Sequence, residues 1–278
     1  MPAAPSLRRT TREALERLGV RPRRRLGQSF LVAPAVVQRI VEVADVRGKR
    51  VVEIGPGLGT LSDALAAVAS EIALVEIDPR MADGLRERYA AAAHVRVVDA
   101  DALDVDFADL LGGSQDAVAV GNLPYSAGTQ ILLRLLEARR FFTRLVLMLQ
   151  REVAERIVAG PGTKAYGTLS VWTALYGEAR IALRVPSGAF LPRPKVESAV
   201  VTIALRGEPR VHIADEEQFR DVVRGAFGQR RKTLRGALAR MATADQIEAA
   251  GIDPKRRGET LTLGEFAAIA NLLAGGAR

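Results

Sequence analysis

Short apolar segments alternate with longer amphipathic segments from Arg50 onward. This alternation is typical of parallel strands joined by helical crossovers. Most of the short segments are almost continuously apolar, which indicates strands covered by helices on both faces. The sequence predicts strands at residues 51–54, 72–77, 95–98, 117–120 and 145–149, and helices at residues 61–69, 80–92, 129–138 and 151–159.

The pattern changes after Gly167, where turns that contain Pro or Gly separate three apolar runs at 169–176, 179–185 and 198–205. The last two runs are predicted to form an antiparallel pair at the edge of the sheet. Beyond Gly207 the chain is predicted to be helical, at residues 216–226, 229–241, 244–250 and 263–274. The expected fold class is therefore α/β with a mostly parallel sheet, plus a small C-terminal α-helical domain.

Charged side chains are unevenly distributed along the chain, and their distribution helps to predict its domains. Residues 1–50 hold 12 basic and 4 acidic side chains, residues 51–150 hold 8 and 14, and residues 151–278 hold 20 and 14. Two basic flanks around an acidic middle suit a protein that grips a polyanion, although a pI near 10.4 is also expected of any protein from an arginine-rich proteome. We expect a basic N-terminal arm at 1–30, a catalytic domain at 31–207 and a helical domain at 208–278.

Composition excludes several classes of protein. The chain has no cysteine, so it can form neither disulfides nor thiolate metal sites. His94 and His212 lie too far apart in sequence for a local metal motif, and we expect no metal. No segment has the apolar run of a secretory signal or a membrane span. Glu13 and Glu16 argue against an organelle transit peptide, so the expected location is cytoplasmic.

A glycine-rich turn follows the first predicted strand. The strand runs into Gly55-Pro56-Gly57-Leu58-Gly59, where backbone can approach a ligand closely and the next helix offers free N–H groups. Glu76 follows Gly55 by 21 residues, a spacing that brings the tip of the second strand beside the turn and its carboxylate within reach of ribose hydroxyls. Asp101, after the third strand, is placed to accept from an exocyclic adenine amine. NAD and S-adenosylmethionine both remain possible at this point.

The segment after the fourth strand, Asn122-Leu123-Pro124-Tyr125, favours methyl transfer to an adenine amine. The N6 lone pair is delocalised into the ring, so two hydrogen-bond acceptors aimed at its N–H groups would make the nitrogen tetrahedral and nucleophilic. The side-chain oxygen of Asn122 and the carbonyl of Pro124 are the expected acceptors. Tyr125 is expected to stack on the base. No metal and no general base is required.

Together with Glu53-Ile54-Gly55-Pro56-Gly57, this tetrad resembles the ribosomal RNA adenine N6,N6-dimethyltransferase family, whose members have a Rossmann-like class I methyltransferase fold. Residues 25–31, 164–170 and 190–198 match further family blocks, so the resemblance covers nearly the whole chain. It implies that S-adenosylmethionine is the cofactor, S-adenosylhomocysteine the product, and Phe190 a second aromatic side chain on the target adenine. The cofactor-binding residues so implied are Gln28, Ser29, Leu31, Gly55, Gly57, Glu76, Ile77, Asp101, Ala102 and Asn122.

Two positions differ from the family pattern. Ser29 stands where the family usually has Asn or His, and Ser126-Ala127-Gly128 replaces the usual Asn-Ile-Ser. Both differences concern how tightly the pocket closes, not the reaction type.

A basic cluster in the C-terminal domain is expected to bind RNA. Arg230, Arg231, Lys232 and Arg235 place four cations within six residues on the helix predicted at 229–241. Arginine's planar guanidinium suits phosphate oxygens. A charge run is usually a solvated face, but this one matches the family's C-terminal block. Arg23, Arg24 and Arg25 are expected to contact RNA or to lie above the cofactor.

The family has two branches with different targets. Residues 251–254 and 256–261 resemble the branch that dimethylates two adjacent adenosines in the 3′-terminal hairpin of small-subunit (16S) rRNA, coupled to 30S subunit biogenesis. We expect this chain to act as a monomer on a 30S assembly intermediate. The alternatives are a large-subunit (23S) rRNA methyltransferase conferring macrolide resistance, an NAD-dependent oxidoreductase, which would leave the tetrad unexplained, and a non-catalytic ribosome-assembly or transcription factor.

Overall fold

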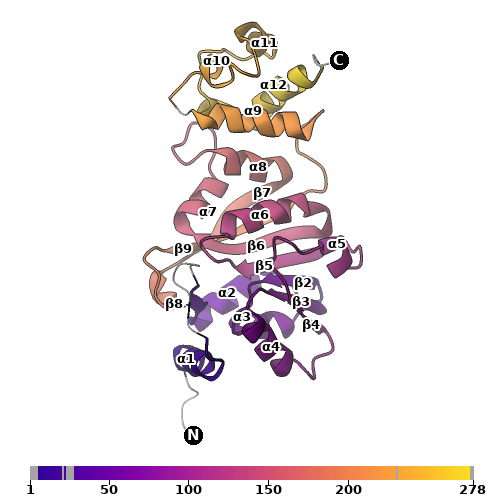
Figure 1. Cartoon of the computed structure of the whole chain (residues 1–278), viewed down its shortest axis with the longest axis vertical. Helices are drawn as coiled ribbons and strands as arrows, with labels where there is room; N and C mark the ends of the chain where they lie inside the picture. The colour runs from indigo at the N-terminus through magenta and orange to yellow at the C-terminus, as the bar shows by residue number, and fades with distance from the viewer. Residues whose placement is uncertain (1–5, 21, 23–27, 230, 276–278) are drawn as a thin grey trace. The chain divides into compact units, whose positions relative to one another are not determined.

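The computed structural model describes residues 6–20, 22, 28–229 and 231–275 (Figure 1). Within these residues a seven-stranded sheet has the order β4-β3-β2-β5-β6-β9-β7. Its strands are β2 (Arg50–Ile54), β3 (Glu71–Glu76), β4 (Val95–Asp99), β5 (Ala117–Asn122), β6 (Phe142–Gln150), β7 (Gly177–Val185) and β9 (Ser198–Leu205).

The pairing within the sheet is parallel from β4 to β6, and β9 then joins β6 in the antiparallel direction. All five predicted parallel strands are present, and their ends differ by at most three residues from the predicted ones. The carboxyl ends of β2, β3 and β5 therefore lie at one edge of the sheet, where open α/β sheets bind ligands.

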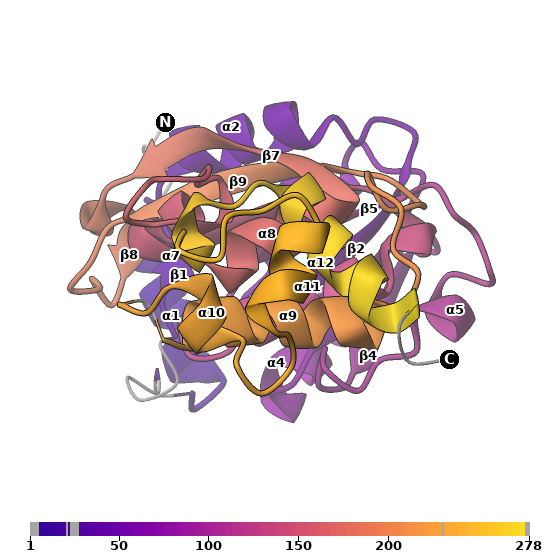
Figure 2. The same ribbon diagram turned by 90° about the horizontal axis from the view of Figure 1, so that it is seen from above.

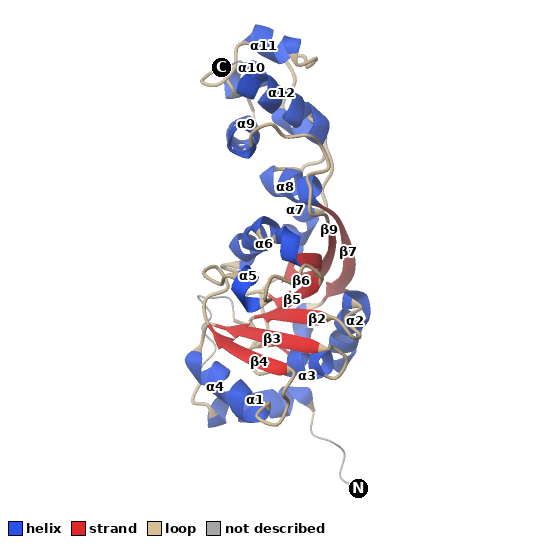
Figure 3. Ribbon diagram, turned by 90° about the vertical axis from the view of Figure 1, so that its right-hand side faces the viewer, coloured by secondary structure: helices blue, strands red, loops and turns tan. Residues whose placement is uncertain are grey.

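Helices cover both faces of the sheet; Figure 3 shows α2 and α6 on opposite sides. The helices in the described residues are α1 (Leu7–Arg17), α2 (Pro34–Ala44), α3 (Thr60–Ala66), α4 (Pro79–Arg88), α5 (Phe107–Leu110), α6 (Gly128–Glu137), α7 (Arg151–Ile157), α8 (Thr168–Tyr176), α9 (Glu216–Gly228), α10 (Leu234–Ala237), α11 (Ala244–Ala249) and α12 (Leu263–Gly275). The predicted fold class, a mostly parallel α/β sheet with a helical C-terminal region, is confirmed.

Several elements before β2 and beside the site were not predicted from the sequence. Helix α1 lies within the predicted arm and buries Thr11 and Leu15, which are four residues apart on one face. Helix α2 buries Val37, Ile40 and Ala44 at helical spacing, so its signal was present in the sequence. The two-residue strands β1 (Phe30–Leu31) and β8 (Phe190–Leu191), which pair in the antiparallel direction, are too short to produce a periodic pattern.

The prediction of one helix over residues 229–241 was wrong. Helix α9 ends at Gly228, and among the described residues of the range 229–241 only the four of α10 are helical. Thr233 is extended, with ψ near 162°, so the helix cannot continue through it. The N–H groups of Leu234 and Arg235 donate instead to the carbonyls of Arg256 and Pro254, at 2.7 and 3.0 Å. Tertiary hydrogen bonds thus override the local helix propensity.

The chain divides into two compact units, residues 1–154 with 180–205 and residues 155–179 with 206–278. The first contains the sheet, apart from the first three residues of β7, and the glycine-rich turn. Residues 155–179 were included in the predicted catalytic domain but group here with the C-terminal helices. The division of function among arm, catalytic domain and RNA-binding domain stays a prediction. None of the helices in the described residues is both long enough and apolar enough to cross a membrane.

The second unit has an aromatic core. Helices α9 and α12 pack against each other (Figure 2). The rings of Trp172 and Tyr176 stack, and Trp172 meets Phe219 edge to face. Phe227 contacts both Tyr166 and Phe266. Gly258 also belongs to this unit, and a Cβ there would lie 2.7 Å from the carbonyl oxygen of Ala226.

We predict that Gly258→Ala lowers the free energy of unfolding by about 1 to 3 kcal/mol, because the helix backbone at Ala226 must move to admit the methyl group. Gly264→Ala is the matched control, since a Cβ there meets nothing within 4 Å. Urea unfolding of both variants checks this. Equal stability of the two variants would show that the close approach is relieved without cost.

Candidate functional site

The glycine-rich turn between β2 and α3 forms one side of the site. Gly55, Gly57 and Gly59 have positive φ values of 67°, 58° and 79°, which other residues rarely adopt. A Cβ on Gly57 would lie 3.1 Å from the ring of Phe30. The turn therefore requires glycine both for its conformation and for its close contact with β1.

Glu76, the last residue of β3, is bonded to the backbone of this turn. Its Oε2 accepts from the N–H of Gly57 and its Oε1 from the N–H of Asp78, both at 2.9 Å. Burial raises the pKa of Glu76, and backbone N–H donors, those of Asp78 and Gly57 among them, oppose that increase. Each carboxylate oxygen keeps a second lone pair, so Glu76 can still accept two hydroxyl groups of a ligand.

Glu53, in β2, is a second buried acid in the site, and sequence analysis gave it no role beyond its motif. Its side chain is 2% exposed. Its Oε2 and the Ser62 hydroxyl both lack a hydrogen-bond partner among the described residues. Burial is the main cause that raises the pKa of Glu53 to about 8, and nearby Glu76 and Asp63 add to the increase. An unsatisfied buried carboxyl is costly and indicates a missing partner.

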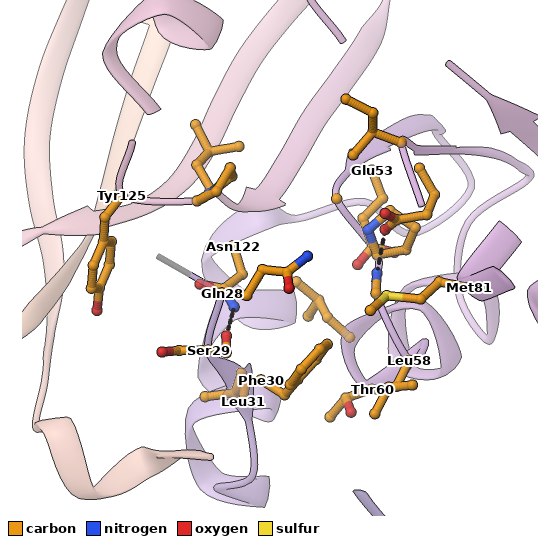
Figure 4. A pocket seen from close by; sticks show the side chains of 18 residues that line it. Gln28, Ser29, Phe30, Leu31, Glu53, Leu58, Thr60, Met81, Asn122 and Tyr125 are labelled. Atoms are coloured by element: carbon orange, nitrogen blue, oxygen red, sulfur yellow. Dashed lines mark hydrogen bonds between the residues drawn. The ribbon is translucent and has the colours of Figure 1, made fainter. Parts of the chain in front are cut away.

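Asn122 ends β5 at the same edge of the sheet. Its Nδ2 donates to the carbonyl oxygen of Ser29 at 3.0 Å (Figure 4). Because a carbonyl can only accept, this bond assigns the amide nitrogen to Ser29 and leaves the side-chain oxygen as an acceptor for a ligand. The backbone of Ser29 thus has a role that does not depend on the hydroxyl that replaces the family's usual Asn or His.

The carbonyl of Pro124 is already engaged. It accepts from the N–H groups of Ala127 and Gly128, at 3.1 and 2.8 Å, at the start of α6. These two bonds compete with an adenine amine for this carbonyl, and the expectation that it accepts from the amine stays a prediction. Leu123 is buried, and its N–H donates to Met148 at 3.1 Å, but no described residue donates to its carbonyl.

The start of α6 explains one departure from the family pattern. Gly128 is buried, and a Cβ there would lie 2.6 Å from Cδ2 of Leu149 on β6. The glycine therefore lets the helix begin tightly against the sheet. Gly128, the last of the three small residues after Tyr125, thus allows α6 to pack closely against β6.

These residues meet in one cleft of the first unit (Figure 4). Predicted site residues that line it are Gln28, Ser29, Leu31, Gly55, Gly57, Glu76, Ile77, Asn122, Leu123, Pro124 and Tyr125. Lining residues that were not predicted include Glu53, Phe30, Thr60 and Met81. The described lining contains two carboxyl groups and no basic side chain, so it suits a ligand that carries positive charge.

Three predicted residues do not line this cleft. Asp101 accepts from the N–H of Leu103 at 2.9 Å, and Ala102 is buried beside it. Phe190 is fully buried and its strand pairs with β1. No described group of three or more His, Asp or Glu side chains is arranged to hold a metal. The roles assigned to individual site residues stay predictions.

The predicted RNA-binding cations lie in two places. Arg23, Arg24, Arg25 and Arg230 fall outside the described residues. Arg231 and Lys232 lie in a turn and Arg235 lies in α10, and all three are exposed. No ion pair joins these three to a carboxylate among the described residues, so they stay available for an external anion.

The known proteins that are similar to this chain are named as ribosomal RNA methylating enzymes. A family profile described as "Ribosomal RNA adenine dimethylase" matches residues 19–275. A protein of Pelotomaculum thermopropionicum named "Ribosomal RNA small subunit methyltransferase A" is 44% identical over 277 residues, covering 94% of both chains. A protein of the same name from Magnetococcus marinus is 45% identical over 263 residues, covering 92% of this chain and 94% of that one.

Two solved structures have a similar fold. A dimethyladenosine transferase from Plasmodium falciparum superposes with a TM-score of 0.74 at 23% identity, covering 86% of this chain and 95% of that one. The 23S rRNA methyltransferase ErmE has a TM-score of 0.68 at 26% identity, covering 88% of this chain and 99% of that one. These similarities confirm the predicted Rossmann-like methyltransferase fold.

We predict that Glu53→Gln changes the pH dependence of stability. The pKa of Glu53 is about 8 in the folded protein, above its ordinary value of 4.5. The folded state therefore binds the proton more tightly, so this contribution to stability is complete below pH 4.5 and is lost as the pH rises through 8. Relative to the wild type, Glu53→Gln should become more stable between pH 5 and pH 8, by a few kcal/mol at most. Denaturant unfolding at several pH values checks this, and parallel curves for the two proteins would contradict it.

Proposed function

Because the chain belongs to the ribosomal RNA adenine dimethylase family, we propose that it dimethylates the N6 amino groups of two adjacent adenosines in the 3′-terminal hairpin of 16S rRNA. The family resemblance of the sequence is thereby confirmed, and the chain is an rRNA methyltransferase. The observation that carries the proposed chemistry is the bond from Asn122 Nδ2 to the carbonyl of Ser29. It leaves the Asn122 oxygen as an acceptor at the tip of β5.

S-adenosylmethionine is the proposed methyl donor, and S-adenosylhomocysteine the product. When bound, the cofactor supplies an electrophilic methyl group on a sulfonium. The residues of the cleft fit it, since Glu53 offers an unsatisfied carboxyl oxygen to a cationic ligand and Glu76 keeps lone pairs for ribose hydroxyls. NAD is less suited, because Asn122 and Tyr125 would then line the cleft without a function.

The chain's own residues prepare the amine for attack. The Asn122 oxygen accepts one N6 hydrogen, which draws the nitrogen out of conjugation with the ring. Since two backbone N–H groups compete for the Pro124 carbonyl, we propose the neighbouring carbonyl of Leu123, which has no donor among the described residues, as an alternative second acceptor. Tyr125 stacks on the base and holds the nitrogen in line with the methyl group. The product ammonium then loses its proton to water.

The small subunit is the proposed target. The relatives named for the small subunit are 44% and 45% identical, whereas the similar 23S rRNA methyltransferase is 26% identical. We further propose that the chain acts as a monomer on a 30S assembly intermediate in the cytoplasm. Contacts of Phe190, Asp101 and Ala102 with substrate or cofactor stay predictions, since none of the three lines the cleft.

We predict that Asn122→Ala lowers methyl transfer to undermethylated 30S subunits at least 100-fold, because the amine loses an acceptor that matters only in the transition state. Cofactor affinity should stay within a few fold. Incorporation of tritium from labelled S-adenosylmethionine and calorimetric titration measure the two quantities. Glu208→Gln, at an exposed position that does not line the cleft, is the comparison variant. Turnover unchanged in Asn122→Ala would refute the role given to this side chain, whereas absence of methyl transfer by the wild type would favour a non-catalytic assembly factor.

We predict that replacing Arg231, Lys232 and Arg235 by Ala weakens RNA binding and reduces the slope of log K against log salt by about 1 for each phosphate that is no longer neutralised. A matched triple variant replaces Arg39, Lys49 and Arg86, which also carry three charges but pair with carboxylates of their own helices or turns. Filter binding at several salt concentrations checks both. Equal slopes for the two triple variants would assign the first three cations to solvent.

A further inference from the structure

Tyr125 is held at the end of its ring by a residue from a distant strand. Its hydroxyl lies 2.7 Å from the hydroxyl of Ser198, at the start of β9. Ser198 is fully buried, whereas Tyr125 is half-buried and lines the cleft. A buried hydroxyl without this partner would remain unsatisfied, so the pair is favoured over the separated groups.

Ser198 is itself fixed by the sheet. It lies opposite Gln150 in the antiparallel pairing of β9 with β6. The same strand β6 pairs with β5, where Met148 lies opposite Asn122, and the carbonyl of Met148 accepts from the N–H of Leu123 at 3.1 Å. The strand that carries the tetrad and the strand that carries Ser198 thus share one rigid neighbour.

The residue before Ser198 is anchored as well. The carbonyl of Glu197 accepts from the N–H of Arg151 at 2.9 Å, and its carboxylate pairs with the guanidinium of Arg151 at 2.7 Å. The start of β9 is therefore held by backbone and side-chain bonds together. The Ser198 hydroxyl, at the start of this strand, is therefore held in place, and the hydroxyl of Tyr125 bonds to it.

We propose that Ser198 is a positioning residue for the target base, which acts by holding the ring of Tyr125 in the orientation that stacks on adenine. This inference rests on the proposed function. Without the tether, two side-chain torsions of Tyr125 would have to be ordered when the base binds. The hydrogen bond to Ser198 fixes these torsions when the protein folds, so their entropic cost is not incurred when the base binds. Base capture is therefore faster, and the cofactor part of the cleft is unchanged.

A double-mutant cycle tests this with Ser198→Ala, Tyr125→Phe and the combined variant. Each single change removes the same hydrogen bond from one side, and Tyr125→Phe keeps the ring. We expect kcat/KM for undermethylated 30S subunits to fall about five- to tenfold in each single variant. The double variant should be no slower than either single one, because the bond can be removed only once. The Kd for S-adenosylmethionine should stay within twofold throughout.

Two further measurements separate positioning from a general loss of structure. Thr202→Val removes another hydroxyl from the same strand and should leave kcat/KM unchanged. An RNA with 2-aminopurine at the target position should lose fluorescence when it stacks in the wild type, and lose less in Ser198→Ala.

Unchanged turnover in Ser198→Ala would overturn the inference. So would a double variant whose loss is the product of the single losses, or a parallel loss of cofactor affinity. Absence of methyl transfer by the wild type would instead refute the proposed function.

Discussion

A single hydrogen bond, from the side-chain nitrogen of Asn122 to the carbonyl of Ser29, sets the chemical character of the cleft. The side-chain amide of Asn122 has a donor nitrogen and an acceptor oxygen, and the reaction requires the oxygen to face the cleft. Ser29 lies just before β1, and β1 is held by β8 and by the bond from Val32 N–H to the carbonyl of Ala189. Segments far apart in sequence thus cooperate to orient one oxygen atom.

The charges of the cleft follow the same logic. Glu53 and Glu76 are buried close to each other at the ends of β2 and β3, and burial raises the pKa of both, since the lining in the described part of the chain has no cation to favour their charged forms. Glu76 is compensated by backbone N–H groups, but one oxygen of Glu53 is not. The folded protein accepts this cost, and a ligand with positive charge would relieve it. Stability is thereby given up where ligand binding can recover it.

Sequence predicted the sheet well because each parallel strand is a continuous apolar run bounded by polar residues. It also placed Gly55, Glu76 and Asn122 at one edge, since carboxyl ends of parallel strands meet there. It failed where distant contacts decide. Nothing local indicates that Thr233 ends a helix, because the bonds that hold Leu234 and Arg235 come from Arg256 and Pro254. The tether between Tyr125 and Ser198 joins residues 73 positions apart, and single-sequence patterns carry no signal for such a pair.

The most direct test of the central claim is mass mapping of modified nucleotides after incubation of the protein with undermethylated 30S subunits and S-adenosylmethionine. The account predicts two adjacent N6,N6-dimethyladenosines in the 3′-terminal hairpin of 16S rRNA, and no other new mass. Methylation confined to 23S rRNA, methylation at a position other than N6, or no gain in mass would contradict it.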